Sequence, residues 1–302
     1  MVSALISIII PTSVGREKEV KALITSLLKM KNEFHEIIVV VDKSKELRNY
    51  LINVKKKHKI IRVLFSSRIR GRCKAKNLGA KKARGDILLF LDDDVKEVSK
   101  NYFKVIRETF TNPIVGAVSG REIKPKKKSI IKKIVSNKVG IITSLGEVIS
   151  NFDANIEKPK IVYALPGCNL AIKKDVFKLV GGFDENYDVG TAYREETDLQ
   201  LRIKKAGYLL IFNPKISVIH EEKESPTRLK KWFRWYYVLN TYFFLKNFNP
   251  SPLKFLFFIY KEFLGCCMRM LIYKKPYPIV YFPRIIEGIV YYMKNKKTTS
   301  RN

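Results

Sequence analysis

The first 95 residues predict an α/β fold with a mostly parallel central sheet and helices on both faces. Apolar runs of strand length alternate there with helical stretches, and parallel strands need such crossover connections. The composition agrees, because 46% hydrophobic and 12% aromatic residues in a chain of 302 suffice for a large buried core and exclude general disorder. The strand-like runs are ALISIII at 4–10, EIIVVVD at 36–42, IIRVLFS at 60–66 and DILLFLDDD at 86–94.

Each connection between these runs has its own signal. The first apolar run ends at Pro11, as a strand entering a loop does. Val20, Leu23 and Leu27 follow at helical spacing and predict one buried helix face. Three connecting helices are expected: one over 16–31, one between the second apolar run and His58, and one over 72–84.

The second half of the chain continues the alternation less regularly. Strands are expected at 114–121 and 169–174, and two short ones, YLLIF and ISVIH, end at His220. Helices are expected over 95–110 and 194–207. Neither G-x-G-x-x-G nor G-x-x-x-x-G-K-[ST] follows a strand, which argues against a dinucleotide oxidoreductase and a P-loop NTPase.

Lysine and arginine greatly outnumber the acids, and this excess calls for an anionic partner. The chain has 59 Lys and Arg against 28 Asp and Glu, a formal net charge of +31. Such self-repulsion destabilises the compact state unless a bound anion offsets it. Nucleic acid, an anionic membrane and a phosphorylated substrate are the candidates. Residues 43–84 are especially basic and contain a single acid, Glu46.

Three consecutive aspartates follow the fourth apolar run. Ligands of open α/β sheets bind beyond the carboxyl ends of the strands, so the Asp92–Asp94 triplet should share a crevice with Thr12 and Asp42. Neighbouring carboxylates raise each other's pKa, and a divalent cation would relieve that repulsion. Oxygen ligands suit Mg²⁺ or Mn²⁺. The alternative is that Asp94 caps a helix over 95–110, although one aspartate would suffice for that role.

An ordered set of motifs resembles the nucleotide-sugar-dependent, inverting glycosyltransferases of family 2, which have the Rossmann-like GT-A fold. The segments follow the order found in that family and end at His220. The resemblance implies a GT-A catalytic domain over 1–225. The matching segments are SIIIPTSVGRE (7–17), EIIVVVDKS (36–44), GRCKAKNLGAKKARGDILLFLDDD (71–94), GCNLAIKKDVFKLVGGFDE (167–185) and EETDLQLRIKKAGY (195–208).

The resemblance implies a metal site. Asp92-x-Asp94 matches the D-x-D motif, with Asp94 as the direct metal ligand and Asp92 facing either the ribose or the metal. His220 matches a histidine that completes the metal site in many relatives, and an ordinary strand-end histidine is the alternative. The implied cofactor is Mg²⁺ or Mn²⁺.

The resemblance also implies donor contacts at several strand ends. Lys76-Asn77 stands where relatives commonly have Arg-Asn near the diphosphate. The second strand is followed by VDKS at 41–44, where relatives commonly have Asp-Asp-Gly-Ser, so only the second aspartate aligns. The implied donor-binding residues are Pro11, Thr12, Asp42, Arg72, Lys76, Asp92 and Asp93.

Glu195-Glu196 stands where relatives carry Glu-Asp, whose second residue is the general base. Glu196 is therefore the implied base for the acceptor hydroxyl, and a single displacement inverts the anomeric carbon. Glu196 is one methylene longer than the aspartate of relatives. Glu195, Asp198 and Asn169 are implied on the acceptor side. On charge alone, these acids could instead stabilise a helix N-terminus, by about 0.3–1 kcal/mol each.

The last quarter of the chain, 226–302, predicts a separate helical appendage. Residues 228–302 hold 15 basic side chains against two acidic ones, Glu262 and Glu287. The longest uncharged stretch is 235–245, shorter than the ~20 residues that cross a bilayer. Basic, aromatic-rich segments suit an anionic membrane surface, and packing on the catalytic domain is the alternative. Five prolines are expected to break the region into short helices: Pro250, Pro252, Pro276, Pro278 and Pro283.

These observations predict metal-dependent transfer of a sugar from a nucleotide sugar to a lipid-linked or other membrane-presented glycan acceptor. The protein is expected in the cytoplasm, with reduced cysteines, on the inner face of the cell membrane. The segment 255–273 could lie on the bilayer or enter it. Two alternatives stay open. One is a soluble transferase acting on protein or polysaccharide. The other is a non-catalytic nucleic-acid-binding protein, which leaves the clustered aspartates unexplained, so nucleic acid is not the expected partner.

Overall fold

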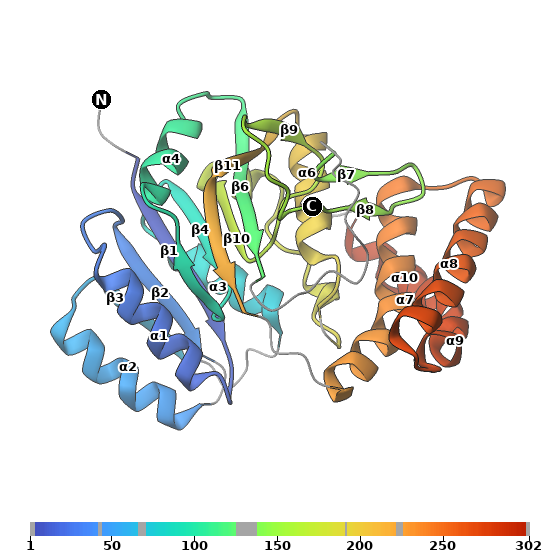
Figure 1. Ribbon diagram of the computed structural model, residues 1–302, viewed down its shortest axis with the longest axis horizontal. Helices are drawn as coiled ribbons and strands as arrows, with labels where there is room; N and C mark the ends of the chain where they lie inside the picture. Colours follow the sequence, from blue (N-terminus) through green and yellow to red (C-terminus); the bar gives the residue numbers. More distant parts are fainter. Residues whose placement is uncertain are drawn as a thin grey trace.

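The computed structural model describes residues 4–41, 44–65, 71–124, 138–190, 192–221 and 226–299 (Figure 1). A central sheet with helices on both sides forms the larger part of the molecule. Helices from the end of the chain form a further layer beside it. This arrangement confirms the predicted α/β fold with a carboxyl-terminal helical part.

The central sheet has nine strands within the described residues, in the order β3-β2-β1-β4-β10-β6-β11-β5, and β9 pairs with β11 off this path. The first four are parallel, β10 is antiparallel to both β4 and β6, and β6 and β11 are parallel. β7 and β8 form a separate hairpin. The strands are β1 (Ile6–Thr12), β2 (Glu36–Val41), β3 (Ile61–Phe65), β4 (Ile87–Leu91), β5 (Val95–Val98), β6 (Val115–Ile123), β7 (Ile141–Ile142), β8 (Val148–Ile149), β9 (Lys160–Val162), β10 (Asn169–Lys173) and β11 (Leu209–His220).

Helices cover both faces of the sheet, which is why its central strands are mostly apolar. Successive side chains of a strand point to opposite faces. Ile8 and Ile10 therefore pack in one core cluster with α1, α2 and α4, whereas Ile9 packs in another with α3, α5, α6 and the carboxyl-terminal helix α7 (Pro226–Phe248). The helices of the catalytic part are α1 (Glu17–Leu28), α2 (Lys45–Lys57), α3 (Arg72–Lys82), α4 (Tyr102–Thr109), α5 (Lys174–Leu179) and α6 (Glu195–Lys205).

The helix predicted over 95–110 is wrong in its first part, because Val95–Val98 forms β5 and α4 begins only at Tyr102. β5 pairs antiparallel with the end of β11, and this pairing overrides the local helical pattern. Asp94 is therefore not a helix cap. It immediately precedes an edge strand whose first residue, Val95, pairs with His220.

The two short strands predicted up to His220 form one long strand, β11, whose register against β6 shifts between Phe212 and Ser217. β1, β4, β6 and β11 all run in the same direction, so their carboxyl ends lie at the same edge of the sheet. This edge is the one that the sequence predicts for the crevice.

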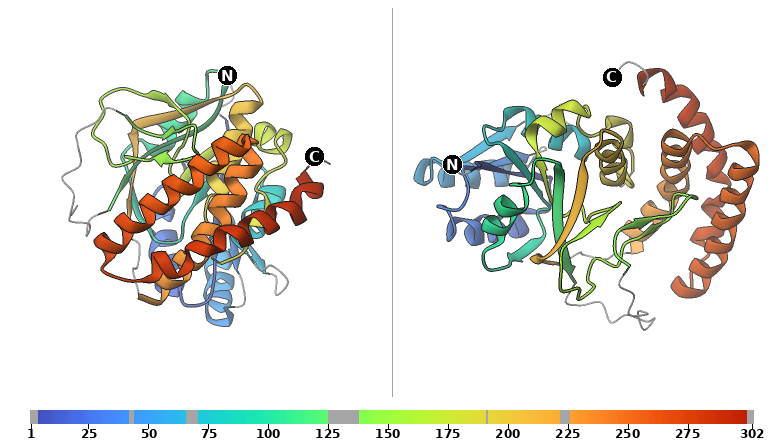
Figure 2. Two further views of the ribbon diagram at one scale, coloured as in Figure 1. Left: turned by 90° about the vertical axis from the view of Figure 1, so that its right-hand side faces the viewer. Right: turned by 90° about the horizontal axis from the view of Figure 1, so that it is seen from above.

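The prediction of short carboxyl-terminal helices is wrong for the first two, which have 23 and 22 residues. The prolines lie at helix starts or between helices, where a missing N–H costs little, rather than in helix interiors. Figure 2 shows α8 outside α7, on the side away from the sheet, whereas α10 crosses α7 and contacts the catalytic part, where the hydroxyl of Tyr291 donates to the carbonyl of Asn186 at 2.6 Å. These helices are α7 (Pro226–Phe248), α8 (Pro252–Tyr273), α9 (Tyr277–Tyr281) and α10 (Ile285–Thr299).

α7 belongs to the core of the catalytic part. Its residues Leu239, Tyr242 and Phe243 are buried in the same cluster as Leu199 of α6 and Phe90 of β4. Among the described residues, none of the helices combines the length and the apolar composition of a membrane span.

Replacing the core aromatic of α7 should destabilise the whole protein. Phe243 is fully buried, so Phe243→Ala is expected to lower the free energy of unfolding by about 3–5 kcal/mol. Phe257 of α8 is 55% exposed, and Phe257→Ala should change it by about 0.5 kcal/mol or less. Denaturant unfolding measures both. Equal effects of the two substitutions would contradict the assignment of α7 to the core.

Candidate active site

The aspartate triplet lies in the turn between β4 and β5, at the carboxyl edge of the sheet. The N–H of Asp92 donates to the carbonyl of Cys168 at 3.0 Å, which ties the turn to the neighbouring β10. The N–H of Glu221 donates to the carbonyl of Asp94 at 3.2 Å, which ties the other end of the turn to β11. The backbone thus holds Asp94 beside the end of β11.

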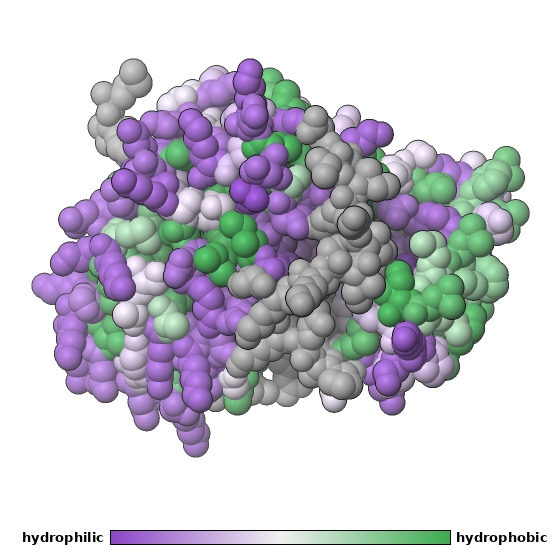
Figure 3. Space-filling view, viewed as in Figure 1, coloured by the Kyte–Doolittle hydropathy of each residue, from purple (hydrophilic) through white to green (hydrophobic). Residues whose placement is uncertain are grey.

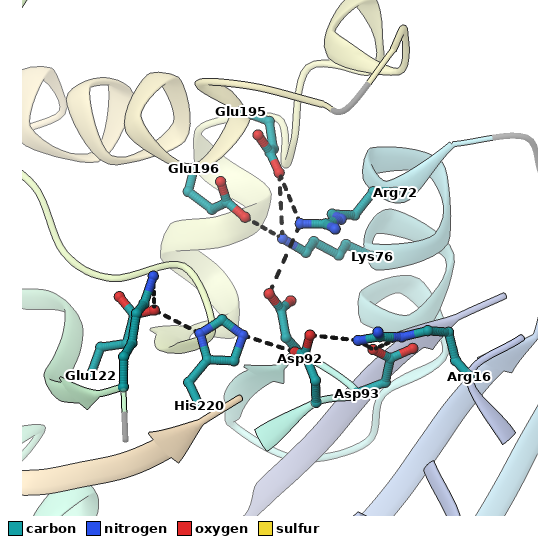
Figure 4. A network of polar contacts seen from close by, with 11 residues as sticks. Arg16, Arg72, Lys76, Asp92, Asp93, Glu122, Glu195, Glu196 and His220 are labelled. Atoms are coloured by element: carbon teal, nitrogen blue, oxygen red, sulfur yellow. Dashed lines mark hydrogen bonds and ion pairs between the residues drawn. The ribbon is translucent and has the colours of Figure 1, made fainter. Parts of the chain in front are cut away.

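Asp94 and His220 are in direct contact, and Figure 4 shows the polar network around His220. The Nε2 of His220 lies 2.8 Å from Oδ1 of Asp94. Burial alone would raise the pKa of Asp94, but hydrogen bonds and the charges of His220 and Arg16 hold it well below its usual range. Burial alone would lower the pKa of His220, but its hydrogen bonds, first of all with Asp94, raise it well above its usual range.

Asp92, Asp94 and His220 form a group that could hold a metal ion. One ligand atom from each lies within 4.8 Å of the other two. Two carboxylates and one imidazole suit Mn²⁺ or Mg²⁺, which favour oxygen ligands and accept nitrogen. The structure thus brings together the three residues that the resemblance names as the metal site.

Asp93 points to the other side of the turn, where Arg16 and Thr12 bind it. The Nε and Nη2 of Arg16 donate to Oδ1 of Asp93 at 3.0 and 2.7 Å, and Nη2 also donates to Oδ2 of Asp94 at 2.5 Å. The hydroxyl of Thr12 donates to Oδ2 of Asp93 at 2.7 Å. Burial raises the pKa of Asp93 despite these contacts.

The sequence reasoning missed Arg16 and Glu122. Arg16 lies within the first matching segment, 7–17, far in the sequence from the aspartates. The sequence therefore contains no direct sign that its guanidinium binds Asp93 and Asp94. Glu122 lies near the end of β6, one residue beyond the predicted strand, and its Oε1 is 2.6 Å from Nδ1 of His220. An acid at the end of a strand that runs parallel to β4 and β11 is a signal of the same kind as Asp94.

The predicted general base, Glu196, and its neighbour Glu195 begin α6, directly across from α3. The Nζ of the fully buried Lys76 donates to Oε1 of Glu196 at 2.6 Å. Glu195 is buried, and neither of its carboxylate oxygens makes a hydrogen bond within the described residues. Its Oε1 lies 3.9 Å from Nζ of Lys76 and 4.0 Å from Nη1 of Arg72.

The surroundings shift the pKa values of the two glutamates in opposite directions. Burial alone would raise the pKa of Glu196, but the positive charge of Lys76 prevails and lowers it to about 2. Burial and the charge of Glu196 raise the pKa of Glu195 well above its usual value. Glu196 is therefore ionised at neutral pH, as a general base must be.

Arg72 lies between the two glutamates of α6 and the aspartates. Its Nη1 lies 3.9 Å from Oδ2 of Asp92 and 4.0 Å from Oε1 of Glu195. Nearby acids, Asp92 above all, raise its pKa, so it stays charged. The two groups of acids therefore face one space that contains a fixed positive charge.

Two residues predicted on the acceptor side are fully buried and bind other side chains. Asp198 is fully buried and forms ion pairs with Arg202 at 3.0 Å and with Lys246 of α7 at 2.8 Å. Asn169 is fully buried on β10 and hydrogen-bonds Ser119. Pro11 lies on β1 beside Thr12, and Asp42 lies outside the described residues.

α7 fixes the start of α6. Arg194, which precedes Glu195, has a left-handed backbone with φ of 77°, a conformation that costs free energy for a residue with a side chain. Its Nε donates to Oδ1 of Asn240 in α7 at 3.0 Å, and both residues are buried. The Nδ2 of Asn240 donates in turn to Glu262 of α8 at 3.0 Å. Glu195 and Glu196 are thus positioned partly by the carboxyl-terminal helices.

The fold and the site together define a glycosyltransferase of the GT-A class. The sequence model of the family described as Glycosyl transferase family 2 matches residues 7–181, more than half of the chain. The chain therefore belongs to this family, as the motifs predict.

Individual relatives agree with this assignment. An uncharacterized glycosyltransferase of Haemophilus influenzae is 26% identical over 243 residues, which cover 78% of this chain and 77% of that protein. N-acetylglucosaminyl-diphospho-decaprenol L-rhamnosyltransferase of Mycobacterium tuberculosis is 39% identical over 64 residues, which are 21% of this chain and 20% of that protein. The solved structure of the mannosyltransferase PcManGT from Pyrobaculum calidifontis, in complex with GDP-Man and Mn²⁺, matches at a TM-score of 0.63 and 15% identity. That match covers 97% of this chain and 88% of the other, and it shows the shared fold.

Removing the cation beside the base should change the pH dependence of the reaction. In Lys76→Met the pKa of Glu196 rises, so the ionised base is lost at a higher pH as the solution is acidified. We expect the acidic limb of the pH profile of kcat/KM to move up by about one unit or more. Lys81→Met, on the exposed side of the same helix, is the matched control and should leave the profile in place. An unchanged acidic limb in Lys76→Met would contradict the assignment of Glu196 as the base.

Proposed function

We propose that this glycosyltransferase moves a sugar from a nucleotide sugar to the hydroxyl of an acceptor at a membrane surface, with inversion and with Mn²⁺ or Mg²⁺ bound. One observation carries the chemical part of the proposal. Arg72 lies within 4.0 Å of both Asp92 and Glu195. The aspartates proposed to bind the metal and the two glutamates of α6 therefore face the same space. A donor held by the acids would present its sugar to the base.

The metal would be held by Asp92, Asp94 and His220, whose ligand atoms are already close together. Their donor set fits a hard divalent cation. When bound, such an ion neutralises negative charge on the diphosphate that leaves the sugar.

Two cations of the chain would act on the same diphosphate. Arg72 and Lys76 project from the first turns of α3 toward the acids. Both are charged, and as phosphate ligands they would favour the leaving group as its negative charge develops. The diphosphate and Glu196 would then compete for the ammonium of Lys76. A shift of Lys76 toward the diphosphate would raise the pKa of Glu196 and make it a stronger base at the moment when the acceptor must be deprotonated.

Glu196 would accept the proton of the acceptor hydroxyl. Its place across the space from the aspartates supports attack on the anomeric carbon from the face opposite to the diphosphate. One displacement of this kind inverts the configuration of that carbon. The glycine at 167 gives the carboxylate room, because a Cβ there would lie 2.6 Å from the Glu196 side chain.

The membrane part of the proposal rests on the outer surface of α8 and α10. Large apolar side chains are exposed there, and the end of the molecule that carries these helices is mostly hydrophobic in Figure 3. Lys254 of α8 and the exposed Lys274-Lys275 pair that follows this helix would meet anionic headgroups. The exposed residues of this surface are Leu253, Leu256, Phe257, Tyr260, Phe263, Leu264, Met268, Leu271, Ile272, Tyr273, Ile286, Val290 and Met293.

A lipid-linked acceptor would be presented at such a surface. The mycobacterial relative is named as an enzyme that acts on a diphospho-decaprenol glycan, and this name supports an acceptor of the same class here. The protein would then lie on the cytoplasmic face of the membrane. The face of α7 that points to the sheet is not available for lipid, because its aromatic residues are buried in the core.

Loss of the metal ligand should abolish catalysis. With purified full-length protein and a panel of UDP- and GDP-sugars, turnover should be stimulated by Mn²⁺. Asp94→Asn should lower it by about 100-fold or more, since an ion at this position contributes several kcal/mol. Asp175→Asn, at an almost fully exposed side chain, is the control. Metal-independent turnover that Asp94→Asn leaves intact would refute the metal site.

Loss of the base should spare donor binding. Glu196→Gln is expected to lower kcat for transfer by about 10²–10⁴-fold, while the affinity for the nucleoside diphosphate with Mn²⁺ stays within about threefold of the unsubstituted protein. Glu157→Gln, at an exposed glutamate, is the control. Near-normal kcat in Glu196→Gln would exclude this residue as the base.

The membrane surface can be tested without truncation, which would remove core residues of α7. Phe257, Leu264 and Leu271 are spaced on one face of α8 and are 55%, 47% and 78% exposed. Their combined replacement by serine should abolish flotation with phosphatidylglycerol vesicles while turnover on a soluble acceptor analogue persists. Ile161→Ser with Leu179→Ser, at exposed apolar residues elsewhere, should leave flotation unchanged. Equal flotation of both variants would refute the membrane surface.

A further inference from the structure

His220 is held from both sides by carboxylates. Its Nε2 lies 2.8 Å from Oδ1 of Asp94, and its Nδ1 lies 2.6 Å from Oε1 of Glu122. All three side chains are largely buried, so water does not compete strongly for these contacts. Figure 4 shows Glu122 on the side of the imidazole that lies away from Asp92.

We propose that Glu122 is the positioning residue for His220, and that it directs Nε2 of the imidazole toward a divalent cation shared with Asp92 and Asp94. The inference rests on the proposed metal site. A neutral imidazole can offer only one nitrogen to a metal, and the other nitrogen carries the proton. A carboxylate that accepts the Nδ1–H fixes the ring orientation and leaves Nε2 as the ligand.

The sheet places Glu122 for this role. β6 and β11 are parallel neighbours, and Glu122 pairs with Val218, two residues before His220. Both strands end at the edge where the aspartate turn lies, so the acid and the histidine project from adjacent strand ends. The register of β6 against β11 therefore determines which side of the ring Glu122 faces.

A second cation keeps Glu122 in place. The Nζ of Lys124 lies 2.9 Å from the same Oε1 of Glu122 that contacts His220. The ion pair balances the negative charge of Glu122, which would otherwise add to that of the aspartates. It also holds the carboxylate oxygen on the side of the ring opposite to Asp94.

One other arrangement of the same residues must be distinguished. Glu122, Cys168 and His220 also have ligand atoms within 4.8 Å of one another. A cation bound there would use Nδ1 of His220 and would make Glu122 a direct ligand. The thiol of Cys168 would then contribute to metal affinity, whereas a site formed with Asp92 and Asp94 does not need it.

Titration of the purified full-length protein with Mn²⁺ alone, followed by calorimetry, tests the inference. His220→Ala and Glu122→Ala should each weaken Mn²⁺ binding, the latter by about 10–100-fold. Glu122→Gln retains an acceptor oxygen for the Nδ1–H and should recover most of the affinity. Glu97→Ala, at an exposed acid on the neighbouring β5, and Cys168→Ser should both bind Mn²⁺ normally. Circular dichroism identifies any variant that fails to fold.

The outcomes separate the inference from the function on which it rests. If His220→Ala weakens Mn²⁺ binding and a folded Glu122→Ala does not, the positioning role is refuted and the metal site stands. If neither change affects Mn²⁺ binding, the metal site itself is refuted, and the inference with it. If Cys168→Ser weakens binding as much as Glu122→Ala, Glu122 is a ligand of the other group and not a positioning residue.

Discussion

The structure depends on how the protein tolerates acids gathered at one edge of its sheet. Asp92, Asp93 and Asp94 are consecutive, and Glu195 and Glu196 face them. Unpaired carboxylates this close together in a partly buried site would repel one another by about several kcal/mol. Each is instead opposed by a cation of the chain. The cations are Arg16, Arg72, Lys76 and His220.

This pairing of acids with cations explains why the pKa values of acids in one site are shifted in opposite directions. Lys76 keeps Glu196 ionised, whereas burial and the nearby charge of Glu196 favour a proton on Glu195. Arg16 and His220 keep Asp94 ionised and therefore able to accept a metal ion. A bound cation and a bound diphosphate would each change these pairings, so binding of the donor and strength of the base are linked through the same few side chains.

The fold could be predicted from the sequence because its signals are local. Apolar runs alternating with amphipathic stretches determine a parallel sheet, and the ordered motifs identify the family. β5 was missed because its four residues form a strand only by pairing with β11, more than 100 residues away. The prolines do separate the carboxyl-terminal helices, but the stretches between them are long, so α7 and α8 each exceed 20 residues where the sequence predicts short helices.

The site was predicted in part, and for a physical reason. Asp92 and Asp94 follow β4, and His220 is the last residue of β11; strand ends of one direction meet at one edge. Glu122 satisfies the same rule but lies outside the family motifs, so only the register of β6 against β11 reveals it. The partners of Asp198 in α7 were equally out of reach, since contacts between distant helices leave no pattern in the sequence.

The central claim is that the acids of this edge form a joint site for a divalent cation and a nucleoside diphosphate. Thermal unfolding of the full chain tests it most directly, with a series of nucleoside diphosphates and with Mn²⁺, Mg²⁺ or EDTA. A ligand that binds only the folded state raises the melting temperature. The account predicts a rise with one diphosphate and Mn²⁺ together that exceeds the sum of their separate effects and disappears in EDTA. A melting temperature that no combination changes would contradict it.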